Sequence, residues 1–315
     1  MSDAPAFDPL PAGALRMQLP SLASIDAEGA DAREFLHGQL SSDVKALTVG
    51  QAHYASYNSP KGRMLATPIV WRRADGHYML VLAADLAEAI RRRLAMFVLR
   101  AKVVLAVSPR PLWGIVGAGA GDLGVPSIPA WSSFAADATA VLHLPDGRWL
   151  VDAGGALPQT IAALPDADEA LWQWCAIRAG VAQIGAATSD KLVAQSANWE
   201  LVGGVDFHKG CYPGQEIIAR MQYLGRLKER LHAFHADAPA AALAAGTAVM
   251  TDGQDNGVGV GIVVAAAPSP AGGSDLLAVV HNDAAAAGVV AAGVRLYPRM
   301  LPYAVPALEN ARVKL

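Results

Sequence analysis

Residues 208–216 read His-Lys-Gly-Cys-Tyr-Pro-Gly-Gln-Glu, and no other stretch of this chain is so dense in reactive and turn-forming residues. Gly210 and Gly214 permit tight turns that other residues resist, because glycine has no Cβ. Pro213 suits the first position of a helix, where its missing N–H costs nothing. We therefore predict a turn at Cys211 and a helix that starts at Pro213.

The same stretch predicts a reactive thiol. The amino terminus of a helix carries partial positive charge, which favours a thiolate over a thiol. Lys209, His208 and Arg220 add cationic side chains near Cys211. This grouping indicates a functional site and is not typical of a structural turn.

Composition sets limits on the rest of the chain. With 315 residues and 53% hydrophobic content, the chain can bury a large core, and its length indicates two or three domains. A formal charge of −3 argues against a protein that coats nucleic acid. The arginine run 91–93 fits either RNA binding or a solvated helix face; we favour the solvated face and expect no direct nucleic-acid binding.

Cysteine usage and hydropathy bear on location. Cys175 and Cys211 match no zinc spacing and are too few for a disulfide framework, so we expect a cytoplasmic protein without a resident metal. The apolar runs 258–267 and 284–294 are shorter than the roughly 20 residues that a membrane helix needs. We therefore expect no membrane span, and we interpret residues 1–20 as a loose arm.

Local patterns predict an α+β protein with antiparallel sheets. Hydrophobic periodicity indicates helices over 30–40, 85–97, 156–163 and 168–179. Asp75-Gly76 and Pro145-Asp146-Gly147 lie between β-type runs and predict two hairpins. From residue 226 onward, short apolar runs separated by glycine turns predict a small antiparallel barrel or sandwich, and we favour the barrel.

These elements divide the chain into three predicted domains. The first covers 1–108 and is completed by part of 185–225; the second covers 109–184; the barrel covers 226–315. In the helix over 168–179, Cys175 shares an apolar stripe and is interpreted as a core thiol. Arg178, near the end of that helix, either complements the helix dipole or contacts a ligand.

Four segments together resemble a known family. Residues 209–216 resemble the K-G-C-Y-x-G-Q-E signature of the YgfZ family, and Ala219, Arg220 and Gly225 continue the match. Residues 35–44 are similar to the family's F-L-Q-G-Q-L-T-N-D-V, and residues 58–63 to its N-x-K-G-R turn with one extra residue. Residues 178–180 precede the usual loop, so the resemblance covers nearly the whole chain.

The resemblance implies both a fold and a function. YgfZ proteins are folate-binding relatives of the glycine-cleavage T-protein, linked to iron–sulfur protein maturation and tRNA modification. The implied architecture is a T-protein-like ring of three domains, with the folate pocket in the middle and the carboxy-terminal barrel closing one side. The implied cofactor is tetrahydrofolate or a derivative. The implied partners are folate and iron–sulfur proteins such as radical tRNA-modifying enzymes.

Two departures from the T-protein pattern change the expected chemistry. Aminomethyltransferases carry acidic residues a few positions after the glycine turn, whereas residues 64–68 contain no carboxylate to support that transfer. T-proteins present a glutamate to the pterin near the position of Arg178, and an arginine cannot accept the pterin hydrogen bonds. Arg178 is expected instead to hold the glutamate tail of a folate or another anion.

The predicted site residues fall into two groups. The catalytic candidates are Cys211 and Lys209, and Cys211 is also a candidate transient iron–sulfur ligand. The cofactor-binding candidates are Arg178, Asn198, Gln215, Glu216, Arg220, Asn58, Lys61 and Arg63. For Glu216 a purely structural role in the first helical turn is an equal alternative.

Three functions remain open at this point. The favoured one is a folate-binding maturation factor that uses Cys211. The alternatives are a folate-dependent aminomethyl or one-carbon transferase, and a non-catalytic folate-binding module in which Cys211 only packs. Whether any reaction is catalysed is left open.

Overall fold

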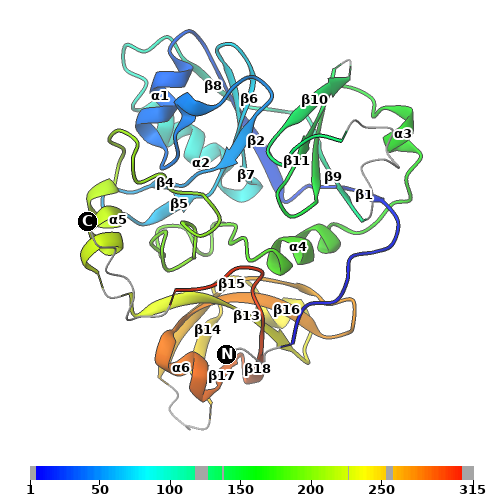
Figure 1. The fold of residues 1–315 in the computed structure, drawn as a ribbon, viewed down its shortest axis with the longest axis vertical. Coiled ribbons are helices and arrows are strands. Elements are labelled where there is room, and N and C mark those ends of the chain that lie inside the picture. The colour runs from blue at the N-terminus through cyan, green and yellow to red at the C-terminus, as the bar shows by residue number, and fades with distance from the viewer. Residues whose placement is uncertain (1–4, 118–126, 137, 226, 253–257, 307–315) are drawn as a thin grey trace.

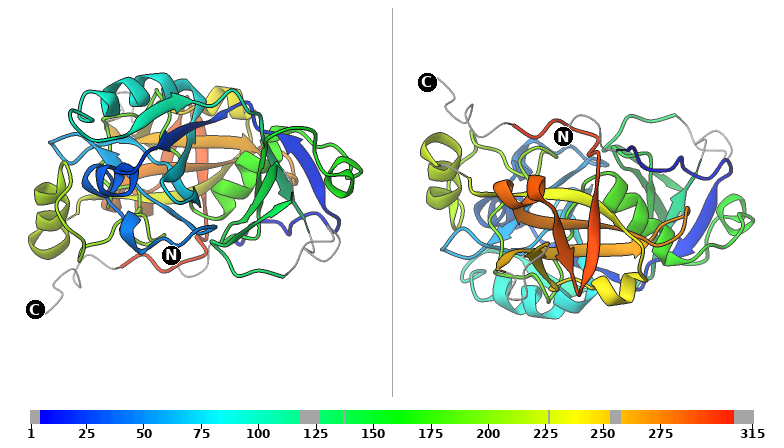
Figure 2. Two further views of the ribbon diagram at one scale, coloured as in Figure 1. Left: turned by 90° about the horizontal axis from the view of Figure 1, so that it is seen from above. Right: turned by 90° about the horizontal axis from the view of Figure 1, so that it is seen from below.

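The structure is a computed structural model that describes residues 5–306 except 118–126, 137, 226 and 253–257. Two five-stranded antiparallel sheets lie side by side, and a closed barrel of six strands lies across one end of both (Figure 1). Views from above and below place helix α5 (Gln215–Leu224) at one outer edge and helix α3 (Gln159–Ala162) at the opposite one (Figure 2). The predicted α+β class with a carboxy-terminal barrel is confirmed.

The first sheet has the strand order β3-β6-β7-β2-β8. Its strands are β2 (Leu22–Glu28), β3 (Ala52–Tyr54), β6 (Ile69–Ala74), β7 (His77–Ala83) and β8 (Val104–Val107). The predicted hairpin at Asp75-Gly76 joins β6 to β7, with Gly76 at φ 69°. Helices α1 (Ala32–Gln39) and α2 (Ala84–Ala95) pack on this sheet, and α2 contacts β2, β7 and β8.

A small hairpin and a loop complete this part of the molecule. Strands β4 (Tyr57–Asn58) and β5 (Met64–Ala66) form the hairpin, and a short 3-10 turn covers Val44–Ala46. Residues 187–214 contain turns but no helix or strand; the sequence predicts a loop or a broken helix over 187–199, and the structure has a loop there.

The second sheet has the order β1-β9-β12-β11-β10. Its strands are β1 (Leu15–Gln18), β9 (Leu112–Val116), β10 (Ser133–Ala136), β11 (Thr139–His143) and β12 (Trp149–Ala153). The predicted hairpin at Pro145-Asp146-Gly147 joins β11 to β12. The prediction of a loose amino-terminal arm is wrong, because Leu15 to Gln18 pair with β9 and Met17 is buried.

This pairing also corrects the first predicted boundary. Residues 15–18 were counted with the first domain, yet β1 forms the edge of the second sheet. The strand alternates apolar and polar residues but is only four residues long and lies in a proline-rich segment, so its partner is set by tertiary contacts that the sequence does not display.

Helix α4 (Glu169–Arg178) lies between the second sheet and the barrel. The Asp168 carboxylate caps it by accepting a 2.8 Å bond from the Ala170 N–H. Trp172 packs so closely on β9 that a Cβ on Gly114 would lie 2.5 Å from its ring. Cys175 is buried as predicted, and burial raises the pKa of its thiol to about 11.

The barrel closes in the order β13-β16-β15-β14-β17-β18. Its strands are β13 (Glu229–Ala236), β14 (Ala248–Thr251), β15 (Gly259–Pro268), β16 (Ser274–His281), β17 (Val289–Ala291) and β18 (Val294–Arg299). A 3-10 turn at Ala240–Leu243 and helix α6 (Asn282–Ala287) occupy the alanine-rich stretches. Closure matters because it leaves no unpaired strand edge.

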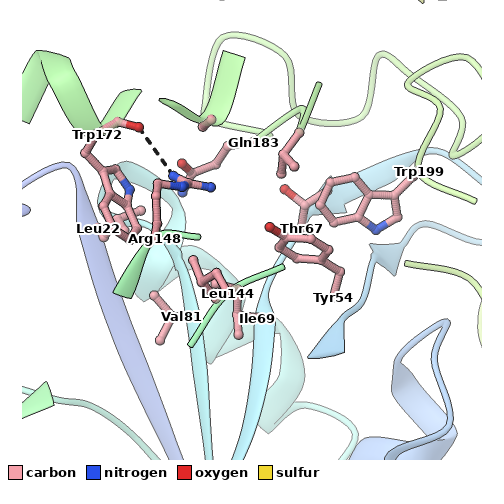
Figure 3. A pocket seen from close by; sticks show the side chains of 12 residues that line it. Leu22, Tyr54, Thr67, Ile69, Val81, Leu144, Arg148, Trp172, Gln183 and Trp199 are labelled. Atoms are coloured by element: carbon pink, nitrogen blue, oxygen red, sulfur yellow. Dashed lines mark hydrogen bonds between the residues drawn. The ribbon is translucent and has the colours of Figure 1, made fainter. Parts of the chain in front are cut away.

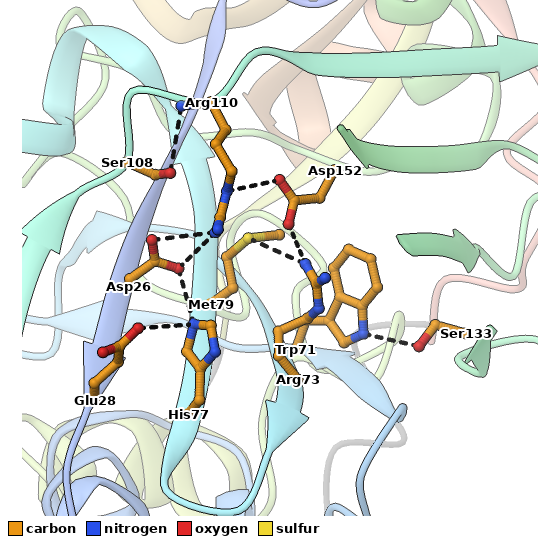
Figure 4. A network of polar contacts seen from close by, with 10 residues as sticks. All are labelled: Asp26, Glu28, Trp71, Arg73, His77, Met79, Ser108, Arg110, Ser133 and Asp152. Carbon is orange, nitrogen blue, oxygen red and sulfur yellow. Dashed lines mark hydrogen bonds and ion pairs between the residues drawn. The ribbon is translucent and has the colours of Figure 1, made fainter. Parts of the chain in front are cut away.

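A charged network joins the two sheets (Figure 4). The Asp152 carboxylate of β12 is 1% exposed; it is bound by Arg73 of β6 and lies 3.1 Å from Arg110 Nε. Arg110 also reaches Asp26 of β2 at 3.1 Å, and His77 Nε2 lies 3.0 Å from the same carboxylate. Burial raises the pKa of Asp26, but His77 and Arg110 outweigh it, so the net pKa is lowered.

We expect Asp152→Ala to destabilise the fold by about 3–5 kcal/mol, because Arg73 would lose its buried counter-ion and Arg110 would keep only Asp26. Urea unfolding measures the change. Asp75→Ala is the control: its carboxylate pairs with Arg72 at 2.5 Å but is 90% exposed, so its loss should cost under about 1 kcal/mol. Equal losses for the two variants would show that the network does not stabilise the sheet contact.

Candidate functional site

Lys209 fixes the cysteine motif to helix α1. Its side chain is 9% exposed, and its ammonium donates to the carbonyl oxygens of His37 and, at 2.6 Å, Leu40. Carbonyls at a helix carboxy terminus lack partners within the helix, so a cation there both bonds to them and complements the dipole. The Tyr212 ring centroid lies 5.1 Å from the same nitrogen.

These contacts give Lys209 a structural role. Burial, only partly offset by the charges of Asp43 and Asp206, lowers the pKa of its ammonium to about 8. A catalytic role for Lys209 remains a prediction.

Cys211 and Gly210 are exposed, whereas Lys209 and Tyr212 of the same motif are buried. The prediction that Pro213 opens the helix is wrong: Gly214 is the cap, in the left-handed conformation with φ 79°, and Gln215 is the first helical residue. The Gln215 N–H donates to the Tyr212 carbonyl at 3.2 Å, so the chain turns at 212–215 before α5 begins. Cys211 thus lies ahead of the helix by a full turn of chain.

Two glycines allow the turn at residues 58–63 to pack against this motif. A Cβ on Gly214 would lie 2.5 Å from the Ser59 carbonyl oxygen and 2.7 Å from Gly62 Cα. A Cβ on Gly62, at φ 72°, would lie 2.8 Å from Ile217 Cβ. The turn at 58–63 therefore packs directly on the start of α5, a contact for which only glycine leaves room.

The three predicted site residues of this turn differ in burial and in hydrogen bonding. The Asn58 side chain is buried, donates to Ser56 Oγ at 3.0 Å, and has no partner for Oδ1 among the described residues. Lys61 is exposed. The Arg63 guanidinium is bound to the Lys191 carbonyl, which ties the hairpin to the loop before the motif.

The remaining predicted site residues near the motif also differ in how exposed they are. Gln215 is half-buried, and Glu216 and Arg220 are exposed on α5 at the edge of the molecule. Asn198 is fully buried: its amide donates to the Leu231 carbonyl at 3.0 Å, and its oxygen accepts from Arg230 at 3.1 Å. Both polar groups of Asn198 thus bind the barrel strand β13.

Arg178 lines a different place, a cavity of about 850 Å³ where the two sheets, α4 and the barrel meet. The wall also includes Phe7 of the amino-terminal segment and Tyr303 beyond β18. Tyr303 donates to the Gly180 carbonyl at 2.7 Å, and burial raises the pKa of its hydroxyl to about 12. Of the ten predicted site residues, only Arg178 lines this cavity.

A smaller inner pocket adjoins the cavity (Figure 3). Tyr54 and Val181 line both spaces. The rest of the inner wall consists of Leu22, Thr67, Ile69, Val81, Leu144, Arg148, Trp172, Ala176, Gln183 and Trp199. The Tyr54 ring lies 4.6 Å from Trp131 and 5.2 Å from Trp199, centroid to centroid.

Sequence reasoning missed these aromatic residues. The only available signal was the density of aromatic side chains in 52–58, which did not reveal that Tyr54 meets Trp131 and Trp199 from distant segments. It also missed Arg148, which is buried, lies 4.3 Å over Trp172 and pairs with Asp146 at 2.7 Å.

The carboxylates that line the cavity and the inner pocket determine which reactions the site could support. Among the lining residues of both spaces, the acid is Asp146, and Arg148 binds it. Thr67, in the segment 64–68, instead presents a hydroxyl that accepts from the Ile184 N–H at 2.9 Å. A carboxylate available to a bound ligand is therefore missing from the described wall.

Two further findings concern the described part of the chain. It contains no group of three His, Cys, Asp or Glu side chains placed to hold a metal ion. None of its helices combines the length and hydrophobicity that a bilayer crossing requires.

Comparison with solved structures defines the class of fold. The glycine cleavage system aminomethyltransferase T of Bartonella henselae superposes with a TM-score of 0.73, covering 93% of this chain and 87% of that chain at 19% identity. The chain therefore has the aminomethyltransferase T fold, a likeness that by itself establishes the architecture alone.

Comparison with curated proteins defines the family. The tRNA-modifying protein YgfZ of Sodalis glossinidius is 30% identical over 325 aligned positions, covering 94% of this chain and 96% of that protein. The protein of the same name from Vibrio vulnificus is 31% identical over 222 residues, 68% of each chain. No protein-family model matches the sequence. The chain belongs to the YgfZ family, which confirms the resemblance seen in its motifs.

The close approach of Gly62 and Gly214 can be tested by Gly214→Ala. We expect a loss of stability well above the roughly 1 kcal/mol of a strained left-handed alanine, because the new Cβ would also push the 58–63 turn away. Gly203→Ala is the matched control, since Gly203 has the same φ of 79° and no atom near its Cβ position. Urea unfolding and hydrogen exchange of residues 58–64 measure the effect; indistinguishable variants would contradict the contact.

The buried ammonium of Lys209 predicts a pH dependence. Its pKa of about 8 lies below the ordinary value near 10.4, so the unfolded chain binds more protons between these values and the free energy of unfolding rises with pH there. Lys209→Met lacks this contribution. We expect the free energy of unfolding of the wild type, relative to that of Lys209→Met, to increase from about pH 8 to pH 10.5. Urea unfolding of both proteins at each pH measures this difference.

Proposed function

We propose that this protein is a folate-binding factor that supports the maturation of iron–sulfur proteins and tRNA modification in the cytoplasm. Its relatives carry the name tRNA-modifying protein, and its fold is that of an aminomethyltransferase. Within this proposal, the central cavity binds a reduced folate and Cys211 is the reactive group.

The observation that carries the folate part is the chemistry of the cavity. Tyr54 and Trp131 line the cavity of about 850 Å³ and offer aromatic surfaces to a flat heterocycle, and Gln183 of the adjoining inner pocket offers both an amide donor and an acceptor. Arg178 lies in the wider part of the same space, where a cation can bind the carboxylates of a glutamate tail. The residues present thus fit a pterin with an acidic tail, which would supply a one-carbon carrier when bound.

The same wall argues against aminomethyl transfer as the alternative. Transfer of an aminomethyl group needs a carboxylate beside the reacting nitrogen to stabilise developing positive charge. Asp146 is already neutralised by Arg148, and Thr67 carries only a hydroxyl. We therefore propose that the folate serves as a bound cofactor or sensor without that transfer.

Cys211 supports the second part of the proposal. Its thiol is exposed, and it belongs to the edge formed by α5 and the 58–63 turn, separate from the wall of the cavity. A thiolate is both a soft ligand for iron and a nucleophile toward sulfur. An exposed cysteine on a rigidly anchored loop can present either function to a partner protein.

Two measurements on matched variants test the proposal. Titration calorimetry with tetrahydrofolate should show binding to the wild type, roughly 10- to 100-fold weaker binding to Arg178→Ala through loss of a charge-assisted bond, and unchanged binding to Cys211→Ala. Complementation of a deletion strain, scored by the activity of an iron–sulfur tRNA-modifying enzyme, should fail with Cys211→Ala.

The outcomes separate the two parts. No heat with the wild type would remove folate from the proposal, whatever the strain shows. Full complementation by Cys211→Ala would remove the thiol and leave a folate-binding module. Cys211→Ser, which retains the size of the side chain, distinguishes lost chemistry from lost packing.

A further inference from the structure

A histidine from another part of the chain lies against the cysteine motif. His37 is in the last turn of α1, and its side chain is 14% exposed. Its Nε2 lies 3.5 Å from the position that a Cβ on Gly210 would occupy. Gly210 directly precedes Cys211, and because it has no Cβ, the space between the ring nitrogen and this part of the loop stays open. One nitrogen of the ring therefore lies beside the loop that presents the exposed thiol.

The other ring nitrogen of His37 faces an acid. Nδ1 lies 3.1 Å from Asp43 Oδ1, which also accepts from the Lys45 N–H at 2.9 Å. The contact with the ring lacks the alignment of a hydrogen bond, as is common before a ligand is bound, and a small rotation of the ring closes it. A carboxylate can only accept, so it favours the neutral tautomer with the proton on Nδ1. The lone pair of Nε2 is then directed to the loop side.

The charges around His37 keep its ring neutral. Burial is the largest cause that lowers the pKa of the imidazole below its ordinary value near 6.5, and the ammonium of Lys209 lowers it further. Asp43 acts in the opposite direction, while Lys45 and Glu34, which pair with each other, act with opposite signs. The net pKa is lowered, so the ring is uncharged at pH 7 and can accept a proton.

Lys209 connects this histidine to the cysteine. Its ammonium binds the backbone carbonyl of His37 itself, so the motif loop and the ring are held on the same turn of chain. Burial lowers the pKa of that ammonium and the charge of Cys211 acts against it, so the thiol and the ammonium lie within electrostatic reach of each other. A cation at such a distance favours the thiolate.

We propose that His37 is the proton acceptor for the Cys211 thiol and that Asp43 is the positioning residue for its ring. An activated nucleophile is recognised by a base beside it and by a third group that orients the base, and this cluster supplies all three. The inference rests on the proposed use of Cys211 as the reactive group, and it names the residues that activate it.

The proposed step needs no oxidant or reductant. The S–H bond of Cys211 breaks, and its proton forms a bond to His37 Nε2. The electron pair left on sulfur forms a bond to a sulfur atom of a disulfide or persulfide, whose leaving sulfur takes the electrons of the broken S–S bond. The imidazolium then gives its proton to that leaving group, which restores the neutral ring.

His37 is also a departure from the family pattern. The family stretch that residues 35–44 resemble has a glutamine at this position. A glutamine can hydrogen-bond to the loop, but it cannot take up a proton at neutral pH. We therefore expect this mode of activation to belong to chains that carry the histidine, and His37→Gln is the substitution that removes the base with the least change of shape.

Thiol alkylation tests the proton transfer. The full chain is treated with iodoacetamide at pH 7, and modification of Cys211 is followed by intact mass. His37→Gln should react at least about tenfold more slowly, because the base is lost, and the midpoint of its pH–rate profile should move to higher pH. Asp43→Asn keeps an acceptor for the Lys45 N–H but loses the charge, so its rate should lie between those of the other two proteins.

Three further variants separate proton transfer from lost structure. His37→Ala should react slowly, and added imidazole should restore part of its rate, which a purely structural role would not allow. His208→Gln removes the exposed histidine nearest in sequence to Cys211 and should change nothing. Cys211→Ser, in which the buried Cys175 is the remaining thiol, sets the background. Lys209 keeps its partners throughout, because they are backbone carbonyls.

The outcomes are distinguishable from those of the proposed function. Equal alkylation rates for the wild type and His37→Gln, or a loss with His208→Gln instead, would overturn the role of His37. A slow His37→Ala that imidazole does not rescue would also overturn it. Either result, together with failed complementation by Cys211→Ala, rejects the inference and leaves the proposed function standing. Full complementation by Cys211→Ala rejects the proposed use of the thiol, whatever controls its reactivity.

Discussion

The architecture depends on a helix that is buried on two sides. Trp172 of α4 packs against the second sheet, and Trp174, two residues on, is fully buried toward the barrel. The Trp174 indole donates to the Asp275 carboxylate of β16 at 2.8 Å, a charge with no exposed surface. A buried indole and a buried carboxylate each carry a large desolvation cost, so their bond fixes the barrel against the helix at one position.

That constraint also separates the two chemical sites. α4 ends at Arg178, inside the central cavity, so the same packing that orients the barrel determines where this guanidinium lies. The cysteine motif is fixed by other means, through the Lys209 contact with α1 and the glycine contact between the 58–63 turn and α5. The proposed ligand cavity and the cysteine motif therefore have independent supports, and a change in one need not displace the other.

Much of the fold was predictable because the relevant forces are local. Asp75-Gly76 sets a hairpin through the conformations of its own turn residues, and the periodicity around Cys175 predicts a helix with a buried thiol. The site was less predictable, since it depends on contacts between distant segments. The sequence identified the motif and the 58–63 turn, but it did not show that Gly62 and Gly214 touch or that Asn198 is committed to the barrel.

Strand β1 has a consequence for how the molecule is made. Leu15 pairs with Val116, so β1 leaves the ribosome without its partner until β9 has been synthesised, and the whole first sheet is translated in between. The strands of the second sheet are thus synthesised partly before and partly after those of the first. Because non-local pairing is slow, we expect the first sheet to form before β1 pairs with β9. Docking of β1 onto the second sheet is then one of the last steps of domain assembly.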